Sequence, residues 1–203
     1  MKCDLLVNKQ NPLPTDYIPE NLVDSNSRSI EAQRIRDGIT KPNILVVSEA
    51  LAWFRAMQKD ALRMGYDIEL DSAYRSYDYQ AEVLDRLLLE EGEEAYKYCA
   101  IPGTSEHQTG LAIDLCIFRG TEYFDEEINE SKPEIIWVHN NAHRYGFIVR
   151  YPLASTADPD DINEITGYKY EPWHLRFVGL ELAKYLVDND LTLEEYHEKK
   201  VIK

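Results

Sequence analysis

A chain of 203 residues, of which 44% are hydrophobic, is long enough to bury one substantial core, so we expect a single domain. Its formal net charge of −15 disfavours a nucleic-acid partner, because phosphate binding draws its affinity from clustered Lys and Arg. Three cysteines without a CxxC pair exclude a disulfide framework and a cysteine-based structural zinc site, and no apolar run is long enough to predict a transmembrane segment.

Residues 1–42 contain four prolines and little periodicity. They are predicted to form an extended arm that packs on the domain that follows, residues 43–203. Polar residues, beginning with Asp4 and Asn8, interrupt the N-terminus too early for the apolar region of a signal peptide. We therefore expect a cytoplasmic protein as the sequence is written, and an extracytoplasmic one if the sequence was trimmed from a longer chain.

The first regular elements are predicted directly after this arm. Apolar residues recur at helical spacing over Val47–Met64, with Ser48 as a plausible N-cap. The alternating run Ile68–Ala73 has the period of a strand. A second helix is predicted over Asp78–Glu91, with Asp78 as its cap and acidic residues on its outer side.

Leu111–Phe118 is predicted to be a buried strand that carries a single charge, at Asp114. A carboxylate in such a strand must be paired, hydrogen-bonded or bound to a metal, because burying it alone costs several kcal/mol or shifts its pKa until it is neutral. Asp114 is therefore the first residue that requires a functional or structural explanation.

The second half of the chain continues the mixture of helices and strands. We predict a helix over Glu134–Tyr145 that ends at a glycine, a strand over Phe147–Tyr151, and a strand over Ile165–Phe177 that is broken at a proline. Two helices follow, and the last begins with Thr192 and Glu195 at capping-box spacing. Short strands among helices, without a glycine-rich dinucleotide fingerprint, favour an α+β domain.

Two segments together contain the ligands for a catalytic zinc site. SEHQTGLAID offers His107 and Asp114, with Gly110 between them to permit a tight turn, and EPWH offers Glu171 and His174. Zinc accepts nitrogen and oxygen ligands in a tetrahedron, and a catalytic site leaves one position for water. Two histidines, one aspartate and a spare glutamate therefore suit metal-assisted peptide hydrolysis.

The chemistry assigns roles to two further side chains. Glu171 is the candidate base, because it stands three positions before a ligand and could take a proton from the attacking water and pass it to the leaving amine. Arg75, which follows the first predicted strand, could balance the negative charge on the carbonyl oxygen or hold the carboxylate of the substrate.

Each of these residues has a plainer explanation when it is taken alone. His107 could be a solvated loop histidine or a hydrogen-bonded core residue, and Asp114 could pair with a buried arginine. His139 and His143 have the ligand spacing of HExxH, but the second position is asparagine, so this pair is interpreted as a feature of a helix face. Cys116 is interpreted as a small core residue.

Four separated segments resemble the D-alanyl-D-alanine carboxypeptidase family of zinc peptidases, and they are SAYRSYDYQ, PGTSEHQTGLAIDL, RYGFIVRYP and ITGYKYEPWHLRFVG. The opening LLVNKQNPLP and the closing LTLEEY are also similar to the ends of that family. The likeness thus covers nearly the whole chain. It implies a compact α+β domain, in which an antiparallel sheet is flanked by helices and one zinc ion lies in an open groove.

The resemblance also implies roles for particular residues. Carried over by position, it makes His107, Asp114 and His174 the zinc ligands, Glu171 the catalytic acid and base, and Arg75 a group that assists the transition state. It further suggests that Gln80, Ser105 and Arg150 line the pocket for the carboxylate of the terminal D-residue. Their alternatives are an exposed helix residue, a turn former and a surface charge at a strand end, respectively.

The activity that this family implies is removal of the C-terminal D-alanine from peptidoglycan stem peptides or their precursors, which would be the partners of this chain. An L,D-carboxypeptidase acting on tetrapeptide stems is an alternative. A zinc-containing binding module without catalysis is another, since one fold can host sites that have lost their chemistry. The acidic loop at residues 155–164 is longer than the resemblance leads us to expect, so it could alter specificity.

Overall fold

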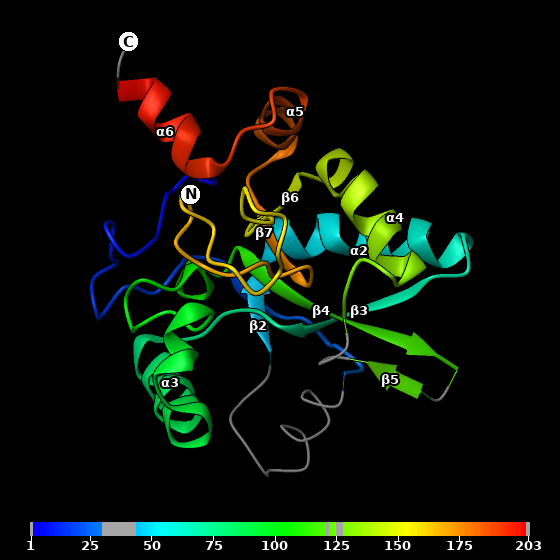
Figure 1. Ribbon diagram of the computed structural model, residues 1–203. Coiled ribbons are helices and arrows are strands. Elements are labelled where there is room, and N and C mark those ends of the chain that lie inside the picture. The colour runs from blue at the N-terminus through cyan, green and yellow to red at the C-terminus, as the bar shows by residue number, and fades with distance from the viewer. Residues whose placement is uncertain (1, 30–43, 121, 125–127, 202–203) are drawn as a thin grey trace.

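The computed structural model describes residues 2–29, 44–120, 122–124 and 128–201. The predicted boundary between the arm and the domain, at residue 42, lies outside the described residues. Helices and short strands are interspersed along the chain, and the strands form a central antiparallel sheet (Figure 1), so the predicted α+β class with an antiparallel sheet is confirmed.

The central sheet has five strands in the order β3-β4-β7-β6, with β5 paired to the far end of β4. Every neighbouring pair is antiparallel. The strands are β3 (Asp67–Ser72), β4 (Ala112–Arg119), β5 (Glu122–Phe124), β6 (Phe147–Val149) and β7 (His174–Phe177). The longest strand, β4, is central. It follows the segment that carries His107, and it pairs with β7, which begins at His174.

Helices surround this sheet (Figure 1). The α-helices are α2 (Ser48–Arg63), α3 (Tyr77–Glu91), α4 (Pro133–Asn141), α5 (Leu180–Asp188) and α6 (Leu193–Val201), and the 3-10 helices are η1 (Gly92–Lys97), η2 (Glu106–Thr109) and η3 (Ala142–Tyr145). Among the described helices, none combines the length and the apolar composition that a membrane crossing needs.

The two faces of the sheet differ in the residues that they carry. On β4, Ile113, Leu115 and Ile117 pack into the main core together with Phe54 and other apolar residues of α2. Successive side chains of a strand point to opposite faces, so Asp114 projects to the other side. The core therefore lies under one face of the sheet, and Asp114 belongs to the second face.

The strand register brings the ligand segments together. Asp114 pairs directly with His174 across β4 and β7, and with Ser72 across β4 and β3. Directly opposed residues of antiparallel strands lie on the same face of the sheet. The sheet alone thus places two of the predicted ligands side by side.

The N-terminal residues are tied to the ligand segment. A two-stranded sheet joins β1 (Leu22–Asp24) to β2 (Leu45–Val47). The Gln108 side chain donates to the carbonyl oxygens of Pro14 and Tyr17 at 2.9 and 3.3 Å, and the Leu13 amide donates to the Gly103 carbonyl at 2.7 Å. The described part of the arm therefore helps to fix the turn around His107.

Several predicted boundaries are wrong by a few residues. Ser48 lies inside α2, whose N-cap is Val47, and Ser76 caps α3 by accepting a hydrogen bond from the Tyr79 amide at 3.1 Å, so Asp78 belongs to the first turn. The strand predicted over 147–151 ends at residue 149, and of the strand predicted over 165–177 only 174–177 form β7. The strands β1, β2 and β5 were not predicted.

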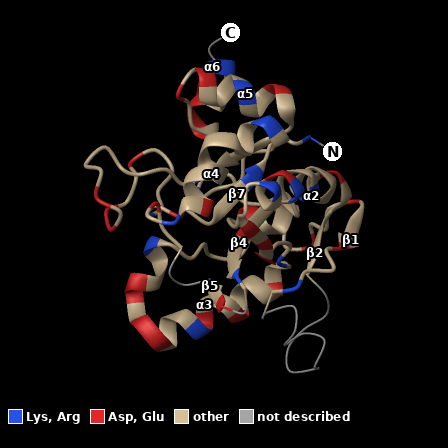
Figure 2. Cartoon of the chain, turned by 90° about the vertical axis from the view of Figure 1, so that its right-hand side faces the viewer, with Lys and Arg blue, Asp and Glu red and all other residues tan. Residues whose placement is uncertain are grey.

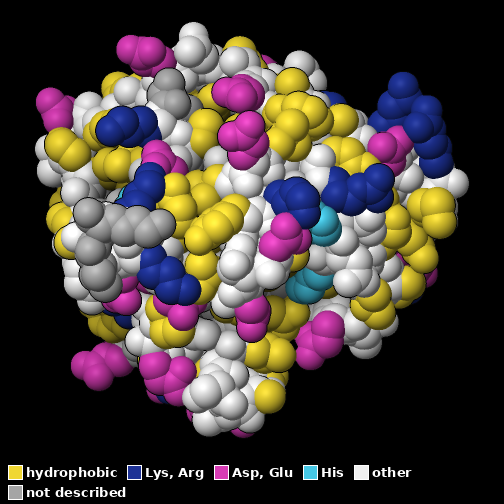
Figure 3. Space-filling model, turned by 90° about the horizontal axis from the view of Figure 1, so that it is seen from above, with side chains coloured by type: hydrophobic (Ala, Val, Ile, Leu, Met, Phe, Trp, Pro, Cys, Tyr) yellow, Lys and Arg dark blue, Asp and Glu magenta, His cyan; other side chains and the backbone are white. Residues whose placement is uncertain are grey.

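Charge is distributed unevenly over the surface. Acidic residues follow one another along α3 (Figure 2), and they are Asp78, Glu82, Asp85, Glu90 and Glu91. Seen from above, acidic and basic side chains are interspersed among apolar ones on this face (Figure 3).

Candidate metal centre and active site

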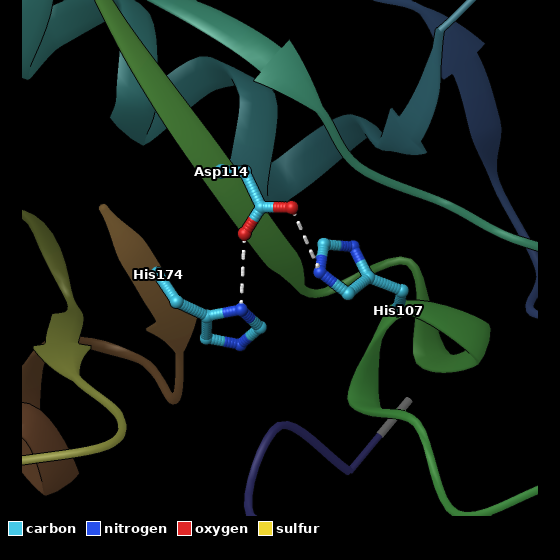
Figure 4. Close-up of side chains that lie close together, drawn as sticks. All are labelled: His107, Asp114 and His174. Atoms are coloured by element: carbon cyan, nitrogen blue, oxygen red, sulfur yellow. Dashed lines mark hydrogen bonds and ion pairs between the residues drawn. The ribbon is translucent and has the colours of Figure 1, made fainter. Parts of the chain in front are cut away.

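Three side chains from three elements converge at one point: His107 from η2, Asp114 from β4 and His174 from the start of β7 (Figure 4). Nε2 of His107 lies 3.2 Å from Oδ2 of Asp114, and Nδ1 of His174 lies 3.0 Å from Oδ1 of Asp114. One potential ligand atom from each residue lies within 4.8 Å of the others. The structure thus brings together the ligands that the sequence predicted.

The orientation of His107 is fixed by the backbone. Its Nδ1 lies 2.5 Å from the carbonyl oxygen of Ala73, so Nδ1 carries the proton and the Nε2 lone pair faces Asp114 and His174. Gly110 ends η2 with φ of +67°, in the left-handed region that favours glycine, and leads the chain into β4. This turn presents His107 and Asp114 to the same space.

These three residues fit a divalent metal ion. Nε2 of His107 is buried and has no hydrogen-bond partner among the described residues, which is costly unless something else occupies its lone pair. Two imidazole nitrogens and one carboxylate oxygen are ligands that zinc accepts, and three protein ligands leave room for water or substrate. His107, Asp114 and His174 form the one group of this kind found in the described part of the chain.

The ionisation of the ligands reflects their mutual contacts. Burial alone would raise the pKa of Asp114, but its contacts with His107 and His174 hold that pKa well below its usual range. Burial, followed by the nearby Arg75 charge, lowers the pKa of His107 to about 4. His107 is therefore neutral near pH 7, which is the form that binds a metal.

Glu171 stands beside the ligand cluster. Its Oε2 lies 3.5 Å from Nδ1 of His174, and the residue is 6% exposed. Burial is the main reason that the pKa of Glu171 rises to about 8, and the negative charge of Asp114 adds to the effect. A carboxyl group with this pKa can accept and release a proton near neutral pH, as a general acid and base must.

The cluster opens into a cavity of about 240 Å³. Its walls include the aromatic rings of Tyr151, Tyr168 and Trp173 and the thiol of Cys99. The Tyr151 ring packs against His174 with 4.8 Å between ring centroids, and against Tyr168 with 5.0 Å. The metal ligands thus lie at the wall of a small, largely apolar pocket that suits a compact chain end.

Arg75 and Gln80 form a pair in this cavity. Nη2 of Arg75 lies 3.2 Å from Oδ2 of Asp114, and its Nη1 donates to Oε1 of Gln80 at 3.2 Å. The Gln80 amide also donates to the Ala100 carbonyl at 2.8 Å. Gln80 is buried, so its alternative interpretation as an exposed helix residue is wrong, and it orients the guanidinium of Arg75.

Ser105 lines the cavity and also has a structural contact, because its hydroxyl accepts a hydrogen bond from the His107 amide at 3.3 Å.

Arg150 lies outside this cavity. It is 1% exposed and does not line the cavity, and its guanidinium binds Glu106 and Glu194 at 2.7 to 2.9 Å. The structure does not bring Arg150 to the predicted carboxylate pocket, and it also rules out the alternative of a surface charge.

The residues considered as alternatives lie outside the cluster of three ligands. Nε2 of His139 lies 2.9 Å from the carbonyl oxygen of Pro172, so this imidazole braces the chain before His174. His143 lies on η3, beyond the end of α4, and belongs to no metal-binding group among the described residues. Cys116 is fully buried, in agreement with its interpretation as a core residue.

Sequence reasoning missed Glu106, the residue before His107. Its side chain is fully buried, and its Oε1 accepts hydrogen bonds from Arg150 and Arg176 at 2.8 Å each. The signal in the sequence was a charged residue directly before a predicted ligand, because such a residue can be buried beside the ligand and paired with other charges. Its two arginine partners come from distant segments, however, and their meeting with Glu106 depends on the sheet.

A comparison with protein families gives this arrangement its context. Residues 43–180 match the family model VanY, described as D-alanyl-D-alanine carboxypeptidase. This match covers more than half of the chain, and it includes the three clustered side chains and Glu171. The chain belongs to the VanY family.

Similar proteins support this assignment over most of the chain. YodJ of Bacillus subtilis (strain 168) is 41% identical over 195 residues, which are 96% of this chain and 66% of YodJ. The structure of the LD-carboxypeptidase LdcB is 41% identical with a TM-score of 0.74, covering 96% of this chain and 85% of LdcB. The structure of the vancomycin-resistance D,D-pentapeptidase VanY with Zn(II) is 30% identical with a TM-score of 0.72, and the match covers 97% of this chain and 99% of that VanY chain.

Proposed function

We propose that this chain is a zinc-dependent carboxypeptidase that removes the C-terminal D-alanine from peptidoglycan stem peptides or their precursors, with a D-Ala-D-Ala end as the preferred substrate. The observation that carries the proposal is a buried glutamate, Glu171, placed 3.5 Å from one of three clustered metal ligands at the wall of a pocket. The family to which the chain belongs, and a similar structure that holds Zn(II), support zinc as the metal.

His107, Asp114 and His174 would hold the zinc ion, which supplies Lewis acidity toward the scissile carbonyl and makes water a stronger acid. Glu171 takes a proton from the attacking water and returns it to the amide nitrogen of the leaving D-alanine, so that the C–N bond breaks without net consumption of a proton. The apolar walls of the pocket limit the access of other water molecules.

Arg75 provides the positive charge. Arg75 lines the cavity, so its guanidinium can reach a substrate bound there. It can stabilise the negative charge that develops on the carbonyl oxygen, or hold the terminal carboxylate. Gln80 keeps the guanidinium in position through its own hydrogen bond.

An L,D-carboxypeptidase that acts on tetrapeptide stems is a second candidate, because the structure of LdcB, an LD-carboxypeptidase, is 41% identical to this chain. The two candidates differ in the configuration of the residue before the scissile bond. D-Alanine release from a pentapeptide and from a tetrapeptide stem, measured side by side, separates them. Faster release from the pentapeptide supports the D,D-preference, and release from the tetrapeptide alone contradicts it.

The mechanism is tested with Glu171→Gln. We expect kcat to fall by about 10²- to 10⁴-fold, the usual contribution of a general acid and base, while the zinc content determined by metal analysis stays the same. Glu164→Gln is the matched control, because Glu164 is an exposed glutamate that does not line the cavity and accepts a hydrogen bond from the Ser155 hydroxyl. Undiminished hydrolysis by Glu171→Gln would refute the mechanism, and wild-type protein that binds zinc but cleaves neither peptide would refute the proposed function.

A further inference from the structure

Two buried atoms without hydrogen-bond partners face each other behind the metal cluster. Oε2 of Glu106 and Nε2 of His174 are 3.9 Å apart, beyond hydrogen-bond distance, and neither has another partner among the described residues. Their side chains are 0% and 4% exposed. Buried polar atoms normally find partners, so this pair requires an explanation.

The tautomer of His174 explains why these two atoms face each other. Its Nδ1 faces the cluster, 3.0 Å from Asp114 and 3.5 Å from Glu171. An imidazole that gives its Nδ1 lone pair to a metal carries its proton on Nε2, and that N–H must then be donated. The described residues offer an acceptor on the side of Nε2: Oε2 of Glu106, 3.9 Å away.

Glu106 is held firmly enough to serve as this acceptor. Its Oε1 accepts from Nε of Arg150 and from Nη1 of Arg176, both at 2.8 Å. Arg176 is anchored in turn to the Leu5 carbonyl at 2.7 Å, and Arg150 to Glu194 of α6. Two arginines and two glutamates thus form a buried network of balanced charge that leaves one oxygen of Glu106 free.

We propose that Glu106 is a positioning residue for the metal: it accepts the Nε2–H of His174, fixes the tautomer and ring orientation of this ligand, and strengthens its Nδ1 as a donor. A histidine ligand commonly gives its second N–H to a carboxylate, and loss of that partner typically weakens metal binding by about 10- to 100-fold. The inference rests on the proposed metal-dependent function, and it gives Arg150 a supporting role in place of substrate binding.

Glu106→Gln is the informative variant. Arg150 and Arg176 both need an acceptor, so they select the amide oxygen and turn the NH₂ group toward His174. A donor then faces the donor Nε2–H. The matched control is Glu194→Gln, which changes a carboxylate of the same network that binds Arg150 but does not contact His174.

Zinc affinity is measured for both variants by competition with a chromogenic chelator, and folding is checked by circular dichroism. We expect Glu106→Gln to bind zinc about 10- to 100-fold more weakly than wild type, and Glu194→Gln to stay within about 3-fold. Equal losses in the two variants, or no loss in Glu106→Gln, would overturn the inference in favour of a structural ion pair.

A second measurement uses wild-type protein and decides the question even where Glu106→Gln does not fold. In zinc-loaded protein with ¹⁵N-labelled histidine, two-bond ¹H–¹⁵N spectra should show His174 protonated at Nε2, with a downfield proton typical of a hydrogen bond to a carboxylate. A proton on Nδ1, or an Nε2–H without that shift, would overturn the inference. D-Alanine release by the same sample tests the proposed function separately.

Discussion

Gly110 shows how a single residue shapes the metal centre. A Cβ atom at this position would lie 2.9 Å from Cδ2 of Leu22 and 3.1 Å from Cγ2 of Val47. Gly110→Ala should therefore destabilise the fold by about 1–2 kcal/mol through its positive φ, plus about 1–3 kcal/mol through overpacking. It should also weaken zinc binding, because His107 is three residues away in the same turn. Urea denaturation and chelator competition measure the two effects.

Gly120→Ala separates the destabilisation caused by the positive φ from the destabilisation caused by close contacts. Gly120 has a φ of +65°, close to the +67° of Gly110, but a Cβ there would meet nothing within 4 Å. The Gly120→Ala protein should therefore lose only the stability that the positive φ costs, and its zinc affinity should not change. Equal destabilisation of the two variants would show that the close contacts around Gly110 relax without cost.

At the level of residues, the ligands could be chosen from the sequence because the chemistry restricts them. A lone Asp114 in an apolar strand demanded a partner, and His107 and His174 came from two motifs of suitable composition. Arg150 could not be placed in this way. Its sequence position at a strand end is compatible with a surface, a pocket or a core, and only the fold shows that Glu106 and Glu194 surround it.

The last helix gives a prediction about an element. Thr192 and Glu195 form the predicted capping box, in which the Thr192 amide donates to Oε2 of Glu195 at 2.8 Å and the Glu195 amide donates to Oγ1 of Thr192 at 3.2 Å. Thr192→Ala should lower the free energy of unfolding by about 1 kcal/mol, because the first turn of α6 loses its side-chain acceptor. Urea denaturation followed by circular dichroism measures this loss.

Glu195→Gln is the control for this element. The amide oxygen of glutamine can still accept from the Thr192 amide, so the variant should lose less than half as much stability as Thr192→Ala. A larger loss in Glu195→Gln would mean that the charge of Glu195, and not the cap geometry, stabilises α6.

The elements that the sequence predicted well are those with a clear period or end signal. α2, α3, β4 and the helix that stops at Gly146, whose φ is +80°, were all found. The segment 165–173 was not, because its aromatic residues favour a strand while Asn163 accepts hydrogen bonds from the amides of Ile165 and Thr166 and turns the chain. Strands of three residues, such as β5, are too short to show a period.

At the level of the whole molecule, the sequence predicted the class of fold but not how its ends meet. Asn8 donates to Glu194 at 3.0 Å, although 186 residues separate them, and the Lys200 ammonium lies 2.7 Å from Asp4. Such long-range contacts leave no local pattern in a sequence. They connect both ends of the described chain to the network behind His174.

Metal binding should therefore stabilise the molecule as a unit. The three ligands come from η2, β4 and β7, so they converge only in the folded chain, and a ligand that binds only this state stabilises it by about 2.7 kcal/mol at a free concentration 100 times its Kd. For a domain of this size that corresponds to a rise in Tm of roughly 5–10 °C. Thermal denaturation in buffered zinc should show this rise, and chelator should reverse it. His107→Ala should melt at the same temperature with and without zinc, because removing one nitrogen leaves too few ligands for tight binding. A wild-type Tm that does not respond to zinc would mean that these three side chains do not share an ion.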